Sequence, residues 1–425
     1  MWADLDRVLL KSSELAPAEF QPGEDIKSVL RDYARVLVIG AGGLGCEILK
    51  DLALSGFRDI EVIDLDRIDI TNLNRQFLFR QSDVGSFKSE VAAKFIMERV
   101  PECKVKAYTC PIQEFDEEFY SGFHIIIAGL DNIEARRWLN SMIYSMVKFD
   151  KDGEPLPETV RPIIDGGTEG FKGQARVVIP YKTACYECTL PMMTPQKGVP
   201  MCTIAETPRI PEHCIEYAYI IEWEKAFPNR KVDKDSYEDM NWIYETALER
   251  AKAYGIEGVT YMKTMGVVKN IIPAIASTNA IVAAACAAEA LKIATYVTKP
   301  VDNYFMFMGQ TGIHTATLQI EKDPNCLVCS NKPGIITIGK NSKLKDFISI
   351  LTDSNSKYKM ISPSISCGAG ILYMPKPPAL EEKHRFKLDL TFQELIDQGF
   401  YGEDFLTVTD QTFINSMNFN LVFRD

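Results

Sequence analysis

The chain has 425 residues, about two to three times the length of a typical domain, which predicts more than one compact core. Hydrophobic residues make up 46% and charged residues 25%, a balance that excludes an intrinsically disordered chain. The formal net charge of −11 argues against broad non-specific binding to nucleic acid or to an anionic membrane, so a nucleotide would have to be held by a local site.

The first part of the chain alternates between short apolar strands and helices. Two helical segments, at 4–15 and 24–33, come first and are interpreted as a lead-in that packs on the next part of the chain. The predicted strands are 35–39, 60–63, 105–109 and 125–127, and the predicted helices are 46–55 and 88–100, with a glycine turn at 40–45. Strands and helices that alternate at such spacings indicate a parallel, doubly wound sheet of the α/β class.

This rhythm is lost from about residue 200 to residue 266, where Trp, Tyr, Glu and Lys at helical spacing indicate a helical insertion. Strands return at 304–307 and 314–320. A linker at 331–334 then precedes a separate pattern of strand, helix and further strands over 335–425. The apolar stretch 271–294 contains Pro273, Asn279, Glu289 and Lys292, so it is interpreted as a buried or half-buried helix and not as a membrane span.

The glycine turn follows a strand and opens a helix, which is the context that a nucleotide-binding fingerprint requires. Its glycines are Gly40, Gly42, Gly43 and Gly45. Glycines allow the backbone to approach a phosphate, and the helix N-terminus offers free N–H groups. Asp64 ends the second strand, where a carboxylate can accept hydrogen bonds from ribose hydroxyls. This pattern alone leaves a merely tight turn open, and it does not separate a nicotinamide cofactor from ATP.

The segment 72–76, Asn-Leu-Asn-Arg-Gln, favours ATP over a nicotinamide cofactor. It places Arg75 and amide side chains just beyond Asp64, and Lys88 follows at a helix start. Two cations at one nucleotide suit a triphosphate whose pyrophosphate must leave. Asp131 follows the strand predicted at 125–127, at the sheet edge where such folds bind ligands, and its carboxylate could hold Mg²⁺. The alternative is that Arg75 and Lys88 are solvated charges and that Asp131 is a helix N-cap.

Cysteine spacing predicts a metal site. The N-terminal residues show no secretory signal, so the chain is expected to stay in the reducing cytoplasm or nucleus. Two C-x-x-C pairs, Cys185/Cys188 and Cys326/Cys329, together form the four-thiolate set of structural zinc, with a redox dithiol as the alternative. Such a zinc ion would tie the middle of the chain to its end.

Two of the remaining cysteines are candidate nucleophiles. Cys202 lies in Pro200-Met201-Cys202-Thr203, where the chain enters the insertion, and Cys214 follows His213. Adjacent residues rarely point at each other, so chemistry alone leaves the two evenly matched. The other five are expected to be small buried hydrophobes: Cys46 and Cys286 in helices, Cys103 and Cys110 beside a strand, and Cys367 in a Ser/Gly-rich loop.

With these residues in place, the chain resembles the enzymes that activate ubiquitin-like modifiers, and within them the catalytic subunits of the heterodimeric neddylation type. The resemblance covers residues 35 to about 330. It rests on 36–47 (VLVIGAGGLGCE), 72–79 (NLNRQFLF), 129–132 (GLDN), 165–170 (DGGTEG), the four zinc cysteines and 200–203 (PMCT).

The resemblance implies a two-step reaction and assigns residues to it. The modifier's C-terminal carboxylate attacks the α-phosphate of Mg-ATP, pyrophosphate leaves, and a Cys thiolate takes the acyl group as a thioester. The ATP site would comprise Gly40, Gly42, Gly43, Gly45, Asp64 (ribose), Asp66, Asn72, Arg75, Gln76, Lys88 (phosphates) and Asp131 (Mg²⁺). The acceptor Cys of the P-x-C-T motif would be Cys202, which leaves Cys214 a structural residue.

The resemblance also implies the domain organisation: a Rossmann-like adenylation domain at 1–200 and 267–332, a helical catalytic-cysteine insertion at 201–266, and a ubiquitin-like β-grasp domain at 333–425 that recruits the conjugating enzyme. Arg176 would repel a modifier that carries Arg near its C-terminus; a plain surface charge is the alternative. Because the chain has one nucleotide fold, a pseudosymmetric partner subunit is expected.

Other functions stay open on the sequence alone. The chain could activate another ubiquitin-like modifier, or it could be an adenylyltransferase for a sulfur-carrier protein, although that class normally lacks the insertion and the C-terminal domain. A non-catalytic scaffold and a nicotinamide-dependent oxidoreductase are further alternatives. Arg75, Lys88 and Asp131 count against the oxidoreductase, because hydride transfer has no need of them.

Overall fold

The computed structural model describes residues 2–14, 16–190, 208–228, 230–234, 236–268, 274–330, 332–402 and 405–424. The chain divides into two compact units, one of residues 1–193 and 274–425 and the other of residues 194–273. The predicted insertion boundaries, 201 and 266, both fall inside the range of the second unit.

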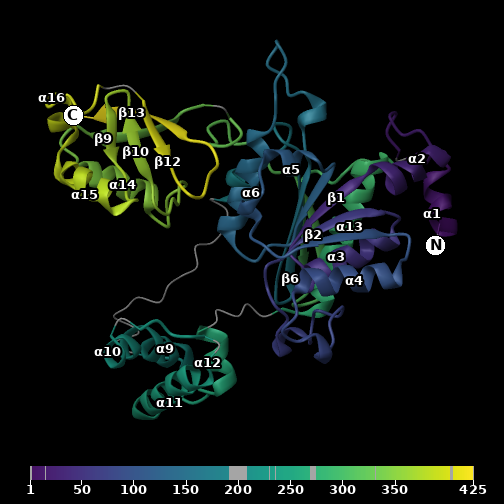
Figure 1. Cartoon of the computed structure of the whole chain (residues 1–425), viewed down its shortest axis with the longest axis horizontal. Helices are drawn as coiled ribbons and strands as arrows, with labels where there is room; N and C mark the ends of the chain where they lie inside the picture. The colour runs from purple at the N-terminus through teal and green to yellow at the C-terminus, as the bar shows by residue number, and fades with distance from the viewer. Residues whose placement is uncertain are drawn as a thin grey trace. The chain divides into compact units, whose positions relative to one another are not determined.

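The first unit is built around the sheet that contains β1, β2 and β6 in Figure 1. This sheet has eight strands in the order β3-β2-β1-β4-β5-β6-β7-β8. The strands are β1 (Arg35–Ile39), β2 (Asp59–Ile63), β3 (Lys104–Tyr108), β4 (Ile125–Ala128), β5 (Ile163–Glu169), β6 (Lys172–Val178), β7 (Tyr304–Met308) and β8 (His314–Leu318). The first five strands in this order pair in parallel, and the remaining pairs are antiparallel. The predicted parallel sheet is thus confirmed, and β6, β7 and β8 extend it by antiparallel pairing.

Helices cover both faces of the sheet because its central strands are apolar on both sides. Val36 and Val38 pack with the helices α3 (Gly43–Leu54), α4 (Lys88–Arg99) and α13 (Ala276–Thr295). Leu37 and Ile39 lie on the opposite face, with α5 (Glu117–Ser121) and α6 (Ile133–Ser145). At the N-terminus, α1 (Trp2–Leu9) overlaps the first predicted helical segment and α2 (Glu24–Ser28) lies within the second, but the expectation that the first helix reaches residue 15 was wrong.

The helix α13 is long and apolar enough to cross a membrane by length and composition alone. It packs against α3, β5 and β6, and Val282, Cys286 and Ala290 on it are fully buried. The expectation of a buried or half-buried helix is therefore confirmed within the described part of the chain.

Residues 334–424 form a separate five-stranded sheet with the order β11-β10-β12-β13-β9, which we call the C-terminal domain. Its elements are β9 (Gly334–Gly339), α14 (Leu344–Thr352), β10 (Ser364–Cys367), β11 (Gly370–Tyr373), α15 (Pro378–His384), α16 (Phe392–Asp397), β12 (Leu406–Thr409) and β13 (Met417–Arg424). The first and last strands pair in parallel at one side, the arrangement expected of a β-grasp fold. Cys367 ends β10 instead of lying in a loop, which corrects that expectation.

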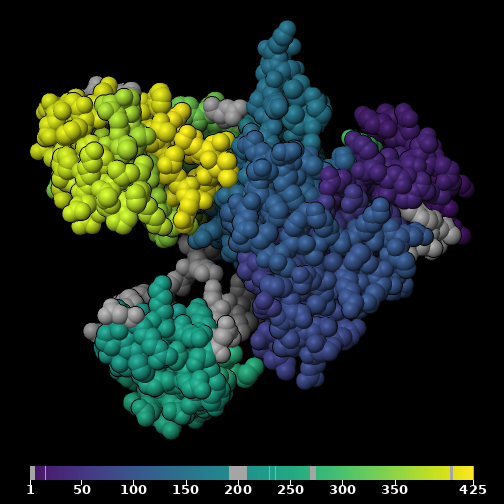
Figure 2. Space-filling model, viewed as in Figure 1, coloured from purple at the N-terminus to yellow at the C-terminus, as the bar shows by residue number. Residues whose placement is uncertain are grey.

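The second unit is helical, as predicted, and has a core of its own (teal in Figure 2). Its helices are α9 (Pro211–Glu216), α10 (Trp223–Ala226), α11 (Tyr237–Tyr254) and α12 (Tyr261–Val268). α11 starts with Ser236, whose hydroxyl accepts the N–H of Asp239, and ends at Gly255 in the left-handed conformation. Both are standard signals for a helix start and a helix end.

The turn from β1 into α3 is too tight for side chains. Gly40 has φ 97°, a backbone conformation that residues with a Cβ rarely adopt. A Cβ atom on Gly45 would lie 1.8 Å from the carbonyl oxygen of Gly40. Glycine at position 45 therefore lets the first turn of α3 pack directly on the end of β1.

We expect Gly45→Ala to lower the free energy of unfolding of the first unit by about 1–3 kcal/mol, because the added methyl group must displace backbone. Gly266→Ala is the matched control: Gly266 also lies in a helix, but its added Cβ would meet nothing within 4 Å, so it should be neutral or slightly stabilising. Amide hydrogen exchange in β1 and in α12 measures the two effects. Unchanged exchange in β1 of the Gly45 variant would contradict the packing described.

Candidate functional site

The candidate nucleotide site lies at the carboxyl edge of the parallel strands. The glycine turn follows β1, Asp64 follows β2 and Gly129 follows β4. β1 lies between β2 and β4, so the chain leaves β1 at the point where the strand order reverses. Ligands of open α/β sheets bind at such switch points.

Asp64 is fixed beside the glycine turn by two backbone donors. Its Oδ2 accepts the N–H of Ala41 at 2.6 Å and its Oδ1 accepts the N–H of Asp66 at 2.8 Å. Burial raises the pKa of this carboxyl above its ordinary value, and the hydrogen bond from Ala41 opposes that shift. The sequence-predicted carboxylate is therefore held next to the turn that is expected to take the phosphates.

Lys88 is positioned by Asp66. Its Nζ lies 2.8 Å from Oδ2 of Asp66 and it is 7% exposed, so it is not a solvated surface charge. The adjacent Ser89 donates its hydroxyl to the carbonyl of Asp64 at 3.1 Å. These contacts tie the start of α4 to the end of β2 and bring a cation to the Asp64 carboxylate.

The segment 72–76 lies against the glycine turn. Asn72 closes a short turn by accepting the N–H of Asp69 at 3.0 Å. The Cγ of Arg75 would lie 3.5 Å from a Cβ placed on Gly43, and its guanidinium donates to the carbonyl of Thr71. Gln76 is buried, and its Oε1 has no hydrogen-bond partner among the described residues.

Asp131 is exposed at the start of α6, and it is not the N-cap of that helix. The cap is Asn132, whose Oδ1 accepts the N–H of Ala135 at 2.7 Å, while its Nδ2 donates to Asp131 at 3.1 Å. The helix-cap alternative for Asp131 is therefore wrong. Its carboxylate is exposed and, among the described residues, accepts one hydrogen bond, from the amide of Asn132. This is compatible with a hard cation.

Sequence reasoning missed Asn279 as a site residue. It lies in the first turns of α13, is 2% exposed, and accepts the Thr168 hydroxyl at 2.7 Å. Its Nδ2 would lie 2.4 Å from a Cβ on Gly43, so this amide packs directly on the glycine turn. The only sequence signal was a polar residue inside an apolar helix, and that signal does not say what the residue contacts.

A buried charge cluster lies beside the nucleotide edge. Asp165 on β5 pairs with Arg136 at 3.0 Å and with Arg176 at 3.1 Å. Arg176 is 4% exposed, donates to the hydroxyl of Thr189, and lies over the ring of Tyr186. The surface-charge alternative for Arg176 is therefore wrong. The cluster holds two guanidinium groups and one carboxylate.

The four cysteines of the two C-x-x-C pairs come together. Their Sγ atoms all lie within 4.8 Å of one another. The Sγ–Sγ separations are 3.8 Å for Cys185–Cys188, and 3.5 Å for both Cys185–Cys326 and Cys188–Cys329. Four ligands at about 2.3 Å around one tetrahedral ion require separations of this size, so the donor set fits zinc.

The two candidate nucleophiles are not equally visible. Cys202 lies outside the described residues, so its role as the acceptor of the acyl group stays a prediction. Cys214 is fully buried in the core of the helical unit, and burial raises the pKa of its thiol. A buried thiol of raised pKa is a poor nucleophile, which agrees with a structural role for Cys214.

Two family models match the chain. The ThiF family model matches residues 13–328 and the E2 binding domain model matches residues 337–423. An E. coli MccB structure with ATP is 22% identical, with a TM-score of 0.46, covering 72% of this chain and 69% of that chain.

Curated relatives match almost the whole chain. The NEDD8-activating enzyme E1 catalytic subunit of Arabidopsis thaliana is 50% identical, covering 92% of this chain and 86% of the relative. That of Drosophila melanogaster is 46% identical, covering 99% of this chain and 94% of the relative. The chain therefore belongs to the ThiF family and, within it, to the NEDD8-activating enzyme E1 catalytic subunits.

Proposed function

We propose that this chain activates NEDD8 at the expense of ATP and passes it to a conjugating enzyme. The observation that carries the proposal is that one chain combines a ThiF-family nucleotide fold with an E2 binding domain. A carboxylate oxygen of the modifier's C-terminus attacks the α-phosphorus, the α–β phosphoanhydride bond breaks, and pyrophosphate leaves. A thiolate then attacks the acyl carbon, and AMP leaves.

The residues of the candidate site take distinct roles in the first step. Asp64 accepts hydrogen bonds from the ribose, and Asn72, Arg75 and Lys88 bind the phosphates. Asp66 supports this arrangement because its Oδ2 lies 2.8 Å from Nζ of Lys88. The Lys88 side chain is therefore already ordered before the nucleotide binds. Asp131 would hold Mg²⁺, which neutralises phosphate charge when bound.

Cys202 is the proposed acceptor of the acyl group. It belongs to the P-x-C-T motif, and Cys214, the competing candidate, is buried. Two other cysteines, Cys46 and Cys286, are also fully buried, and burial raises the pKa of both thiols. An accessible thiol must reach the acyl-adenylate, and these three positions offer none.

The four clustered cysteines would hold a structural zinc ion, and the enzyme would be a heterodimer in cytoplasm and nucleus. Arg176 would select the modifier by charge. Arg136 and Arg176 already place two cations on the Asp165 carboxylate. A modifier that carries Arg at the corresponding point of its tail would add a third cation and would be repelled.

The acceptor can be tested with the complete heterodimer, Mg-ATP and NEDD8 on non-reducing gels. We expect a thiol-sensitive adduct that disappears in Cys202→Ala, because only a thiol can form the thioester. The adduct should survive Cys214→Ala, the matched control. Loss of the adduct in the Cys214 variant alone would reverse the assignment.

The metal role of Asp131 can be separated from folding. We expect Asp131→Ala to reduce NEDD8-dependent exchange of label between pyrophosphate and ATP by about 10²-fold or more, because transition-state charge loses its counter-ion. Glu134→Ala, which removes another exposed carboxylate at the start of α6, should leave exchange nearly unchanged. Equal exchange in the two variants would remove Asp131 from the metal role.

Zinc should support folding and not chemistry. We expect metal analysis of the purified chain to give about one zinc per chain and removal by a strong chelator to lower the thermal unfolding midpoint, since four clustered thiols lose their shared cation. A chain that contains no metal and still unfolds at the same temperature would contradict the four-cysteine site.

A further inference from the structure

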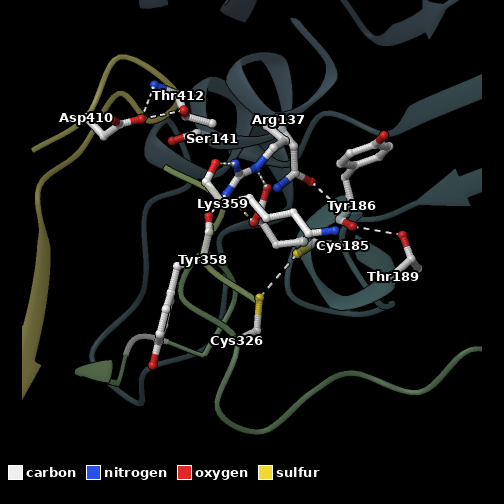
Figure 3. A network of polar contacts seen from close by, with 12 residues as sticks. Arg137, Ser141, Cys185, Tyr186, Thr189, Cys326, Tyr358, Lys359, Asp410 and Thr412 are labelled. Atoms are coloured by element: carbon white, nitrogen blue, oxygen red, sulfur yellow. Dashed lines mark hydrogen bonds and ion pairs between the residues drawn. The ribbon is translucent and has the colours of Figure 1, made fainter. Parts of the chain in front are cut away.

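Arg137 is a buried cation that belongs to no part of the nucleotide site. It lies on α6, is 2% exposed, and directs its guanidinium toward two other segments (Figure 3). One is the turn that carries Cys185 and Cys188, and the other is the C-terminal domain. Because a buried guanidinium must have its charge and N–H groups satisfied, both segments are needed to hold it.

Glu187, between the two cysteines, supplies the charge. Nε of Arg137 donates to Oε1 at 2.7 Å and Nη2 donates to Oε2 at 3.0 Å. This bidentate geometry is the strongest form of an Arg–carboxylate contact. The side chain of Glu187 is 4% exposed, so water does not replace either partner. The backbone of the same turn is also tied to α6, because the N–H of Tyr186 donates to Asn140 at 3.0 Å.

The C-terminal domain supplies two carbonyl acceptors. Nη2 of Arg137 donates to the carbonyl of Tyr358 at 2.6 Å, and Nη1 donates to that of Lys359 at 2.7 Å. Lys359 has φ 44°, in the left-handed region, and this turn lets two successive carbonyls face one guanidinium. Both hydrogen bonds thus depend on the conformation of this turn. The centroid of the Phe413 ring lies 4.8 Å from the guanidinium carbon.

A second contact follows one turn later on the same face of α6. The N–H of Ile414 donates to the hydroxyl of Ser141 at 3.0 Å. Asp410 joins the two contacting loops of the C-terminal domain, because its carboxylate accepts the N–H groups of Ile361, Ser362 and Thr412. The C-terminal domain therefore meets α6 through two loops that Asp410 joins, and Arg137 donates both to Glu187 and to two carbonyls of that domain.

We propose that Glu187 makes the seating of the C-terminal domain depend on the metal held by the four cysteines. With the ion in place, Cys185 and Cys188 fix the turn, Glu187 holds Arg137, and Arg137 holds the carbonyls of Tyr358 and Lys359. Without the ion, the turn loses its anchors at Cys185 and Cys188, and the hydrogen bond from Tyr186 to Asn140 no longer suffices to fix the side chain of Glu187. Arg137 then lacks its counter-charge and turns toward water, and the C-terminal domain is released from α6.

This inference rests on the proposed zinc site and goes beyond it. A structural metal is expected to stabilise the segments that it joins. Here its effect would extend to a domain that contributes no ligand. Since that domain matches the E2 binding model, Glu187 and Arg137 would act as positioning residues for the conjugating enzyme.

Amide hydrogen exchange on the full chain tests the inference. The reporter is the N–H of Ile414, which is bonded to α6; the reference amides are those of β12 and β13, which are paired within the C-terminal domain. We expect Glu187→Gln to keep its zinc and its β12–β13 protection but to speed exchange at Ile414 by about tenfold or more. The amide side chain keeps the shape of Glu187 and removes its charge.

Glu381→Gln is the matched control. Glu381 also accepts two hydrogen bonds from one arginine, Arg385, at 2.7 Å each, but on the exposed helix α15. It should leave exchange at Ile414 unchanged. If Glu187→Gln fails to fold, Arg137→Met gives the same test from α6. Unchanged exchange at Ile414 in the folded variant would overturn the inference.

Chelation provides the second arm. Removing the metal from the unmodified chain should speed exchange at Ile414 while β12 and β13 stay protected, and it should add little in Arg137→Met, where the connection is already broken. A purified chain without metal would overturn the zinc proposal, and this inference with it. A chain that loses its metal and keeps Ile414 protected would overturn the inference alone.

Discussion

The candidate nucleotide site depends on how closely the backbone packs at the end of β1. A Cβ on Gly40 would lie 2.7 Å from the carbonyl oxygen of Gly129, and one on Gly45 would lie 1.8 Å from that of Gly40. Only residues without a side chain allow the end of β1, the start of α3 and the loop after β4 to meet. Asp64 and Asp131 follow β2 and β4, the two strands that flank β1, so both carboxylates lie at the same edge of the sheet.

The proposed site can suit a triphosphate on an acidic chain because its cations are fixed locally. Lys88 is held by Asp66, and Arg75 lies against Gly43. Asp64 is held in turn by backbone N–H groups on both oxygens. Groups that are ordered before the ligand arrives lose little conformational entropy on binding, so a local site can act against an unfavourable overall charge.

The helix α6 links functions that the sequence presents as separate. Its first residues lie beside Asp131, and Arg136 pairs with Asp165. Arg137 contacts the turn that carries Cys185 and Cys188, through Glu187, and it also contacts the C-terminal domain. Neighbouring positions on a helix point in different directions, so one helix serves a nucleotide edge, a charge cluster and a domain contact. A shift of α6 would therefore alter the nucleotide edge, the charge cluster and the contact with the C-terminal domain together.

Sequence alone determined the features that depend on residues close together along the chain. Alternating strands and helices predicted the parallel sheet, the glycine turn predicted its tight connection to α3, and the C-x-x-C spacing predicted a four-cysteine cluster. Tertiary structure alone decided which distant residues meet. It placed Asn279 on Gly43, buried Arg176 against Asp165, and joined Arg137 to Glu187 and Lys359. The physical reason is that spacing and chain conformation are local properties, whereas a buried amide or charge is satisfied by whichever partner the packed fold brings within hydrogen-bond distance.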